Sequence, residues 1–307
     1  MDLSVVVPVY NEEDNVKELL TRLVETLSDG GSESGTPRSY ELVVVDDGST
    51  DTTLSRLLEL HKRFPTMRVV QLRGNFGQTA AMRAGFDEAR GDVIVSMDGD
   101  LQNDPRDIPM MVDKLDEGYD LAAGWRQNRQ DPFLTRKLPS KIANWIIAKV
   151  TGVPIHDNGC SLKAYRADVI REAPLYSELH RFIPAMVSLV GGRIVEVVVR
   201  HHPRTKGASK YGLSRALKVP LDIVTVKMLV AFSERPLHWF GMFSLATVLL
   251  SASLFLLISP SPVVATSLLM LAGFLATHLL VVGLVGELIV LMSRRINGRA
   301  TTRIQSS

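Results

Sequence analysis

The sequence predicts an α/β fold with a mostly parallel sheet, followed by a hairpin of two membrane-spanning helices. In the N-terminal part, short apolar runs rich in Val and Ile alternate with segments of helical periodicity. That alternation is typical of a parallel sheet covered by helices on both faces. Farther along, residues 236–286 contain no Lys, Arg, Asp or Glu. Because about 20 apolar residues are enough for a helix to cross a bilayer, this stretch can hold two crossings.

The strand and helix pattern begins at the first residues. The run Leu3–Val9 is almost wholly apolar and predicts a strand buried on both faces, and residues 12–27 then repeat apolar side chains at helical spacing. We expect the Gly- and Ser-rich residues 28–39 to form a surface loop. Further strands are expected at residues 41–45, 67–72, 93–97, 121–124 and 194–199, with helices ending near residue 64 and spanning about residues 79–89 and 133–150. Right-handed crossovers would join the parallel strands.

Polar side chains follow these expected strands at the points where the strands end. Asp46 and Asp47 follow the second strand, Asn75 follows the third, and Asp98 and Asp100 follow the fourth. In open α/β sheets, ligands bind outside the carboxyl ends of the strands. We therefore expect one ligand crevice that these side chains share.

The pair Asp98 and Asp100 indicates a metal site. Two carboxylates separated by one residue tolerate a neighbouring anionic ligand only if a cation neutralises them, and oxygen ligands favour Mg²⁺ or Mn²⁺. Such an ion would stabilise negative charge on a leaving diphosphate. A lone Asp-x-Asp also occurs in solvated turns, but the position after a buried strand favours the metal site.

Basic side chains collect after the fifth expected strand, and Arg forks bind phosphate oxygens well. The group is opposed by Asp131 alone and consists of Arg126, Arg129, Arg136, Lys137 and Lys141. It predicts an anionic acceptor. The alternative is a basic face on anionic lipid headgroups, most of all for Lys137 and Lys141. The loop at residues 204–210 has the same two interpretations.

The membrane crossings are expected at residues 239–258 and 263–292, on either side of Ser259-Pro260-Ser261-Pro262. Residues 213–232 mix apolar side chains with Arg and Lys, as in an amphipathic helix on a membrane surface. Basic residues dominate both flanks of the apolar stretch, which places the flanks and the N-terminal domain in the cytoplasm. The expected organisation is a globular domain at 1–212, a juxtamembrane region at 213–235, the hairpin at 236–293 and a basic tail at 294–307.

The hairpin is also the expected targeting signal, so the protein is predicted to be a multi-pass protein of the inner (plasma) membrane. Asp2 and Pro8 interrupt a short apolar run that has no basic leader, unlike a cleavable signal. The single cysteine, Cys160, allows no intramolecular disulfide, which suits a reducing cytoplasm, and we expect it to be a small buried residue.

Several other polar or small residues have structural interpretations. The histidines His156, His201 and His202 lack metal-ligand spacing among themselves and are expected to be structural or loop residues. His278 and Glu287 would be costly facing lipid, and helix–helix contacts, or an interfacial position for Glu287, are preferred to a functional role. Small residues of the second crossing allow close helix approach and make self-association plausible, namely Gly273, Ala276, Gly283 and Gly286. A P-loop and a Ser-His-Asp triad are excluded, and no nucleic-acid partner is expected.

Motifs along nearly the whole chain resemble those of the family 2 glycosyltransferases, specifically the polyprenyl-phosphate glycosyltransferases. Four motifs are similar to the donor site of that family: Pro8-Val9-Tyr10-Asn11-Glu12, Val45-Asp46-Asp47-Gly48-Ser49-Thr50-Asp51, Asn75-Phe76-Gly77-Gln78 and Asp98-Gly99-Asp100-Leu101-Gln102. Four more continue the resemblance: Arg126-Gln127-Asn128-Arg129, Asp157-Asn158-Gly159-Cys160, Arg181-Phe182-Ile183-Pro184 and Ser209-Lys210-Tyr211-Gly212.

The resemblance implies a GT-A fold, a nucleotide-sugar donor, and a metal ion, Mg²⁺ or Mn²⁺, at Asp100 and Gln102. It implies nucleotide contacts from Pro8, Tyr10, Glu12, Asp47 and Asp98, and lipid-phosphate contacts from Arg126, Arg136 and Ser140. From the same motifs we add Asp46, Asn75 and Gln78 to the expected donor site, and Asp157 and Lys210 to the acceptor site. The expected catalytic set is Asp98, Asp100, Arg126, Arg129 and Arg136.

This chain differs from the usual family pattern next to the two aspartates. The family usually has Ala where the chain has Gly99, and Pro where it has Asn103 or Asp104. We expect these changes to loosen the turn without removing a ligand.

The expected reaction is transfer of a sugar with inversion of its anomeric configuration. Two alternative functions are considered. A lipid phosphate oxygen would attack the anomeric carbon while the nucleoside diphosphate leaves, and UDP with undecaprenyl phosphate are the favoured substrates. A processive polysaccharide synthase shares the donor domain but carries a Gln-x-x-Arg-Trp motif and more crossings, which this sequence lacks. A non-catalytic nucleotide-sugar-binding membrane subunit is disfavoured because the carboxylates and the arginines are both present.

Overall fold

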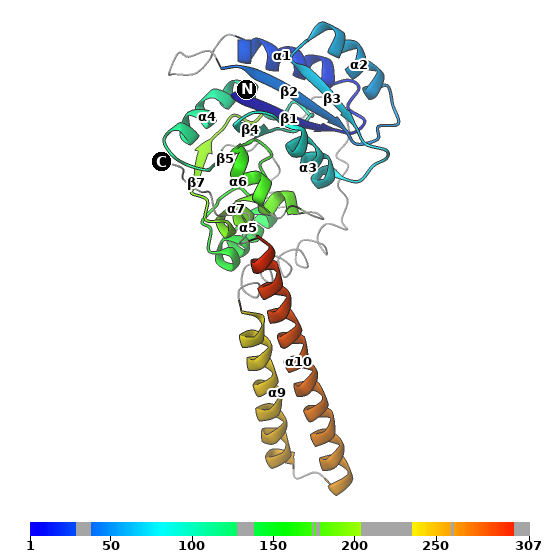
Figure 1. Cartoon of the computed structure of the whole chain (residues 1–307), viewed down its shortest axis with the longest axis vertical. Coiled ribbons are helices and arrows are strands. Elements are labelled where there is room, and N and C mark those ends of the chain that lie inside the picture. The colour runs from blue at the N-terminus through cyan, green and yellow to red at the C-terminus, as the bar shows by residue number, and fades with distance from the viewer. Residues whose placement is uncertain are drawn as a thin grey trace. The chain divides into compact units, whose positions relative to one another are not determined.

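The protein consists of two compact units, Met1–Val226 and Lys227–Ser307. The computed structural model (Figure 1) describes residues 1–28, 38–127, 138–173, 175, 179–203, 235–258 and 261–297. The expected amphipathic helix at 213–232 and the basic tail at 294–307 fall wholly or largely outside these residues.

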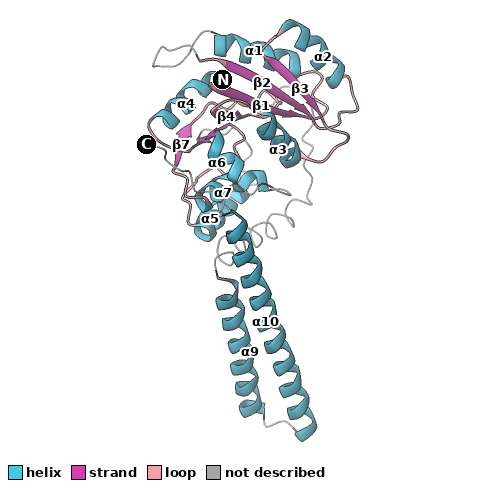
Figure 2. Cartoon of the chain, in the orientation of Figure 1, coloured by secondary structure: helices cyan, strands magenta, loops and turns pink. Residues whose placement is uncertain are grey.

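The first unit is built on a seven-stranded sheet with the order β3-β2-β1-β4-β6-β5-β7 (Figure 2). The strands are β1 (Leu3–Val9), β2 (Tyr40–Asp46), β3 (Met67–Gln71), β4 (Val93–Ser96), β5 (Leu121–Trp125), β6 (Lys163–Arg166) and β7 (Ile194–Val198). Neighbouring strands are parallel except that β6 runs antiparallel to both β4 and β5. All strands but β6 therefore end at the same edge of the sheet.

Helices cover both faces of the sheet, as the continuous apolar strands require. They are α1 (Val16–Ser28), α2 (Thr53–Arg63), α3 (Gln78–Glu88), η1 (Pro105–Asp107), α4 (Ile108–Asp116), α5 (Leu138–Thr151), α6 (Ala167–Glu172), η3 (Leu179–Phe182) and α7 (Ile183–Leu189). The helices α1, α2 and α4 share one core with Val5, Val7 and Val44. On the other face α3 lies close to the sheet, since a Cβ at Gly85 would come within 2.3 Å of Val6 Cγ1.

The predicted alternation of strands and helices is confirmed, with one strand missed. The strand β6 was not predicted, because Lys163–Arg166 has neither a continuous apolar run nor a clean alternation. Tertiary contacts hold it in the sheet: the Tyr165 hydroxyl lies 3.0 Å from Ser96 Oγ, and its ring packs edge-to-face on Phe86. Three predicted strands extend one residue too far, namely those at 67–72, 93–97 and 194–199. The predicted helix at 133–150 is described from Leu138 onward.

The second unit is a hairpin of two apolar helices, α9 (Pro236–Ile258) and α10 (Pro262–Asn297). Its segments Pro236–Leu257 and Pro262–Ile289 are long and apolar enough to cross a membrane. Both helices begin slightly earlier than predicted, at prolines suited to a first helical turn.

Polar and small side chains join the two helices of the hairpin. Ser244 Oγ donates to the Ala276 carbonyl at 2.9 Å, and the Leu237 backbone N–H donates to Glu287 Oε2 at 3.3 Å. The helix–helix contact predicted for Glu287 is thus confirmed. For His278 the prediction is wrong, because its ring is exposed and bonds the Phe274 carbonyl of its own helix.

Candidate functional site

The carboxyl edge of the sheet brings together the segments that follow β1, β2, β3 and β4, as predicted. The first two segments are fastened to each other by short polar side chains. The Asn11 backbone N–H donates to Ser49 Oγ at 2.9 Å, and the side-chain oxygen Oδ1 of Asn11 accepts from the Thr50 backbone N–H at 2.8 Å. The Glu12 N–H donates to Thr53 Oγ1 at 2.9 Å. The motif that contains Pro8, Tyr10 and Glu12 therefore lies directly beside the motif that follows β2.

Asp47 fixes the loop between β3 and α3. Its buried carboxylate accepts the backbone N–H groups of Phe76 and Gly77 at 2.8 and 2.9 Å. The turn needs Gly48, which has φ +68° and lies so close to the loop that a Cβ would be 2.5 Å from the Gly74 carbonyl carbon. Asp46 is also buried and accepts the Ser49 N–H at 3.3 Å. Both aspartates, predicted to bind the donor, thus shape this edge of the site.

Asp98 is bonded to the start of the helix that follows this loop. Gln78 Nε2 donates to Asp98 Oδ1 at 2.6 Å. Burial and the nearby Asp100 carboxylate raise the pKa of Asp98, while a hydrogen bond from Ser161 and the charges of Arg126 and Lys163 act in the opposite direction. Because the raised pKa reflects the cost of a negative charge at Asp98, a bound cation nearby would favour its ionised form.

The turn that carries Asp100 and Gln102 is tightly held, so the predicted loosening is wrong. A Cβ at Gly99 would lie 2.8 Å from Val9 Cγ1, so Val9 occupies the space that the usual Ala would need. Asn103 Nδ2 donates to Ser161 Oγ at 2.7 Å. Asp104 caps η1 by accepting the Arg106 N–H at 3.1 Å, and Pro105 follows it at the start of the helix, where no backbone N–H is needed.

On the acceptor side, Arg126 and Asp157 are each other's partners. Arg126 Nε and Nη2 contact the two oxygens of Asp157 at 2.7 and 2.9 Å, and both side chains are largely buried. The neighbouring His156 stacks on Trp125 with ring centroids 4.6 Å apart and lies 2.6 Å from a Glu196 oxygen. The pair predicted to hold the acceptor is therefore an internal ion pair that fixes the loop at residues 156–160.

The other predicted acceptor residues are not described in the structure. Arg129, Arg136 and Lys210 fall outside the described residues, and Ser140 lies in α5 without a described side chain. Their assignment stays a prediction.

Comparison with known proteins decides the family. Residues 4–173 match the Glycosyl transferase family 2 model. The chain is 48% identical to the dodecaprenyl-phosphate galacturonate synthase of Rhizobium johnstonii over 245 residues, which cover 78% of this chain and 71% of that protein. The chain belongs to the family 2 glycosyltransferases. This glycosyltransferase is also 40% identical over 225 residues to the undecaprenyl-phosphate 4-deoxy-4-formamido-L-arabinose transferase of Edwardsiella ictaluri, with 73% and 67% covered.

Solved structures share the fold of the glycosyltransferase domain. Glucosyl-3-phosphoglycerate synthase from Mycobacterium tuberculosis, in complex with Mn²⁺ and UDP-glucose, matches with a TM-score of 0.54 and 18% identity over 74% of this chain and 78% of that one. Its complex with Mn²⁺, UDP and phosphoglyceric acid matches with a TM-score of 0.53, 20% identity and coverage of 74% and 77%. The predicted GT-A-like fold is confirmed.

The residues of the glycosyltransferase fit a divalent cation at Asp100 and Gln102. Both side chains offer oxygen ligands, and the Asp98 carboxylate, whose pKa is raised, lies two positions before Asp100 in the sequence. Among the described residues no three His, Cys, Asp or Glu side chains form a metal cage. Mg²⁺ and Mn²⁺ at nucleotide sites need no such cage, because one or two carboxylates, substrate phosphates and water complete the coordination.

Sequence reasoning missed Lys163, a fully buried cation near the acidic pair. Its ammonium donates to the Cys160 carbonyl and, at 3.4 Å, to the Asn158 carbonyl. Burial lowers the pKa of Lys163, and its charge in turn favours ionised Asp98. No local signal marked this lysine, because Lys163–Arg166 lacks the apolar pattern of a buried strand. Cys160, three residues earlier, is buried, as predicted.

Proposed function

We propose that this glycosyltransferase moves a sugar from a nucleotide diphosphate sugar, most simply a UDP-sugar, to a polyprenyl phosphate such as undecaprenyl phosphate. The observation that carries the proposal is the pair Asp98 and Asp100 at the carboxyl edge, in a chain 48% identical to a dodecaprenyl-phosphate galacturonate synthase. The two apolar helices support a lipid-borne acceptor, since they would keep the domain at the membrane that carries it.

The donor half of the site would be built from the segments after β1 to β4. Pro8, Tyr10 and Glu12 would contact the nucleotide, and Asp47 would hold the wall formed by residues 74–77. Asp98, oriented by Gln78, would face the nucleotide. Bound at Asp100 and Gln102, Mg²⁺ or Mn²⁺ would offset the negative charge of the leaving diphosphate.

The acceptor phosphate needs positioning more than it needs a general base. A phosphate monoester has a second pKa near 6, so its oxygen is already mostly ionised at neutral pH. The protein would align two anions and offset their repulsion, with attack from the face opposite the leaving group and inversion at the anomeric carbon. Arg126, Arg129, Arg136, Ser140 and Lys210 are the proposed phosphate contacts, and Asp157 would orient the Arg126 guanidinium.

We further propose that the catalytic domain lies on the cytoplasmic face of the inner membrane. Basic residues flank the apolar helices on both sides in the sequence, and such residues favour the cytoplasm. Self-association would involve Gly273, beside which the described residues leave open space, whereas Gly283 and Gly286 pack against α9.

A donor screen tests this function. The purified full chain would be incubated with Mn²⁺, a polyprenyl phosphate and a panel of UDP- and GDP-sugars, including uronic acid and aminopentose donors. We expect one donor to give a lipid-linked sugar that requires the polyprenyl phosphate. Hydrolysis without any lipid product, or binding of a nucleotide-sugar with no turnover across the panel, would contradict the proposal and favour the non-catalytic subunit.

A further inference from the structure

Two segments from distant strands meet at the candidate metal site. The first is the metal loop, residues 100–107, which follows β4; the second is the β7 exit segment, residues 199–203. In the sheet β4 and β7 are separated by β6 and β5. Nevertheless Asn103 and His201 form an antiparallel bridge, and the His202 backbone N–H donates to the Gln102 carbonyl at 2.8 Å. The backbone of the predicted metal ligand Gln102 is thus held by the β7 exit segment.

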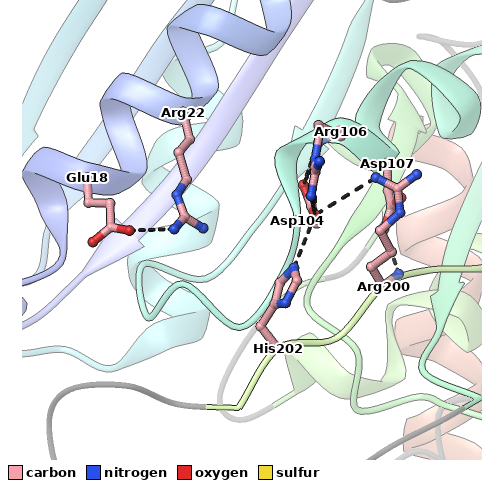
Figure 3. Close-up of polar contacts among 7 residues, drawn as sticks. All are labelled: Glu18, Arg22, Asp104, Arg106, Asp107, Arg200 and His202. Carbon is pink, nitrogen blue, oxygen red and sulfur yellow. Dashed lines mark hydrogen bonds and ion pairs between the residues drawn. The ribbon is translucent and has the colours of Figure 1, made fainter.

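Side chains reinforce this junction (Figure 3). His202 Nε2 lies 3.1 Å from Asp104 Oδ2, and the Arg200 backbone N–H donates to Asp107 Oδ2 at 2.6 Å. The Arg200 guanidinium adds longer contacts to Asp107 at 3.5 Å and to Asp104 at 3.9 Å. The carboxylates of Asp104 and Asp107 are 5% and 4% exposed. Buried carboxylates at this level require partners. Asp104 takes its nearest partner from its own loop, since Arg106 Nη2 lies 2.6 Å away, and the β7 exit segment supplies the contacts of His202 and Arg200.

The metal loop needs such support because its backbone is strained. Leu101, between the two predicted metal ligands, has φ +62°, which is in the left-handed region. A non-glycine residue in this conformation is strained, and it persists only where surrounding contacts hold it. The Gln102 amide also reaches the segment, since its Nε2 lies 3.5 Å from the His202 carbonyl oxygen. This contact directs the NH₂ group to His202 and leaves the amide oxygen for a cation.

We propose that His202 and Arg200 are positioning residues for the metal: through Asp104 and Asp107 they hold the metal loop in the strained conformation that aims Asp100 and Gln102 at one ion. The inference rests on the proposed function, in which the metal lies at Asp100 and Gln102. It adds that the outer strand β7, on the acceptor half of the sheet, preorganises the donor's metal site.

The test measures Mn²⁺ affinity of the purified full chain by calorimetry in the presence of UDP. Mutation of residues that orient metal ligands typically weakens metal binding about 10- to 100-fold. We expect His202→Ala to weaken Mn²⁺ binding about 10-fold, near the lower end of that range. His202→Gln, whose amide can still donate to Asp104, should restore most of the affinity. Saturating Mn²⁺ should return the transfer rate of His202→Ala close to that of the unaltered protein.

A double-mutant cycle separates positioning from direct ligation. Asp104→Ser keeps an N-cap oxygen for η1 but is too short to hold His202. If His202 acts through Asp104, the single and double variants should weaken Mn²⁺ binding by a similar factor. Additive losses, or a loss in His202→Ala that His202→Gln does not repair and Asp104→Ser does not share, would overturn the inference.

Arg166→Ala is the matched control. Arg166 is the last residue of β6, and its Nε lies 3.6 Å from Asp120 Oδ1. It pairs with Val93 at the start of β4, at the opposite end of that strand from the metal loop. It should leave Mn²⁺ affinity unchanged; an equal loss there, or unchanged affinity in His202→Ala, would overturn the inference. Asp100→Ala separates the assignment of the metal site from the positioning role of His202. If that variant still binds Mn²⁺ and transfers sugar normally, the metal does not lie at Asp100 and the inference fails with it. If it loses both, a negative result at His202 removes only the positioning role. The proposed function itself fails only if the unaltered chain forms no lipid-linked sugar.

Discussion

Gln78 donates a 2.6 Å hydrogen bond to Asp98, which joins the first turn of α3 to the end of β4 across the candidate donor site. The bond restrains the carboxylate whose pKa is raised by burial and by Asp100. It also connects two of the four motifs that resemble the donor site of the family.

Removing this bond should impair transfer without unfolding the domain. A hydrogen bond to a charged group contributes about 1.5 to 3 kcal/mol, so Gln78→Ala should lower kcat/KM about 10- to 100-fold. Gln78→Glu should lower kcat/KM further, because it adds a third carboxylate beside Asp98 and Asp100. Steady-state kinetics checks both variants. Unchanged kcat/KM in Gln78→Ala would show that Asp98 needs no such orientation.

Gly99→Ala should destabilise the chain even though the family usually has Ala at this position. The new Cβ would come within 2.8 Å of Val9 Cγ1, and overpacking of this kind costs about 1 to 3 kcal/mol. Thermal unfolding followed by circular dichroism should give a lower Tm for Gly99→Ala. In a Val9→Ala background the same substitution should cost little, and an equal loss of Tm in both backgrounds would refute the steric explanation.

Replacing either Arg126 or Asp157 alone should lower the Tm far more than replacing both together. Removing one member of a buried ion pair leaves an unpartnered charge and costs about 3 to 5 kcal/mol. Arg126→Met and Asp157→Leu should each lower Tm strongly, and the double variant should recover much of the loss while remaining inactive if Arg126 also contacts the acceptor. Full activity of the double variant would limit the pair to a structural role.

Glu41 should contribute stability that is lost in acid. Burial works to raise the pKa of Glu41, but hydrogen bonds from Ser4, the Arg90 N–H and Arg68 outweigh it and lower the pKa below its ordinary value of 4.5. Since the pKa is lower in the folded state, the contribution is present above pH 4.5 and disappears as pH falls through the folded-state pKa. Tm measured against pH should fall less steeply in acid for Glu41→Gln than for the unaltered protein. If Tm falls with pH equally steeply in both proteins, Glu41 is not a source of the acid sensitivity.

The donor half of the site was predictable because its signals are local. Continuous apolar runs specify β1, β2 and β4. Because these strands are parallel, the polar residues that follow them meet at one edge of the sheet for any loop conformation. Asp47, Asp98 and Asp100 could therefore be assigned to one crevice from spacing alone.

The remaining features depend on contacts between residues far apart in the sequence. The strand β6 owes its place to Tyr165 and Ser96, and buried Lys163 enters the site with it. The pairing of Arg126 with Asp157 and of His202 with Asp104 joins residues 31 and 98 positions apart. No periodicity in a single segment contains that information, and the fit of Gly99 against Val9 is equally invisible in the sequence.

The most direct test of the account is transfer of a radiolabelled sugar to polyprenyl phosphate by the purified full chain and its Asp100→Ala variant, with Mn²⁺ present. We expect a chloroform-soluble product from the unaltered chain that chelation by EDTA prevents, and none from Asp100→Ala despite normal membrane insertion. Full activity of Asp100→Ala, or a product that forms equally well in EDTA, would contradict the assignment of the metal and of the site built around it.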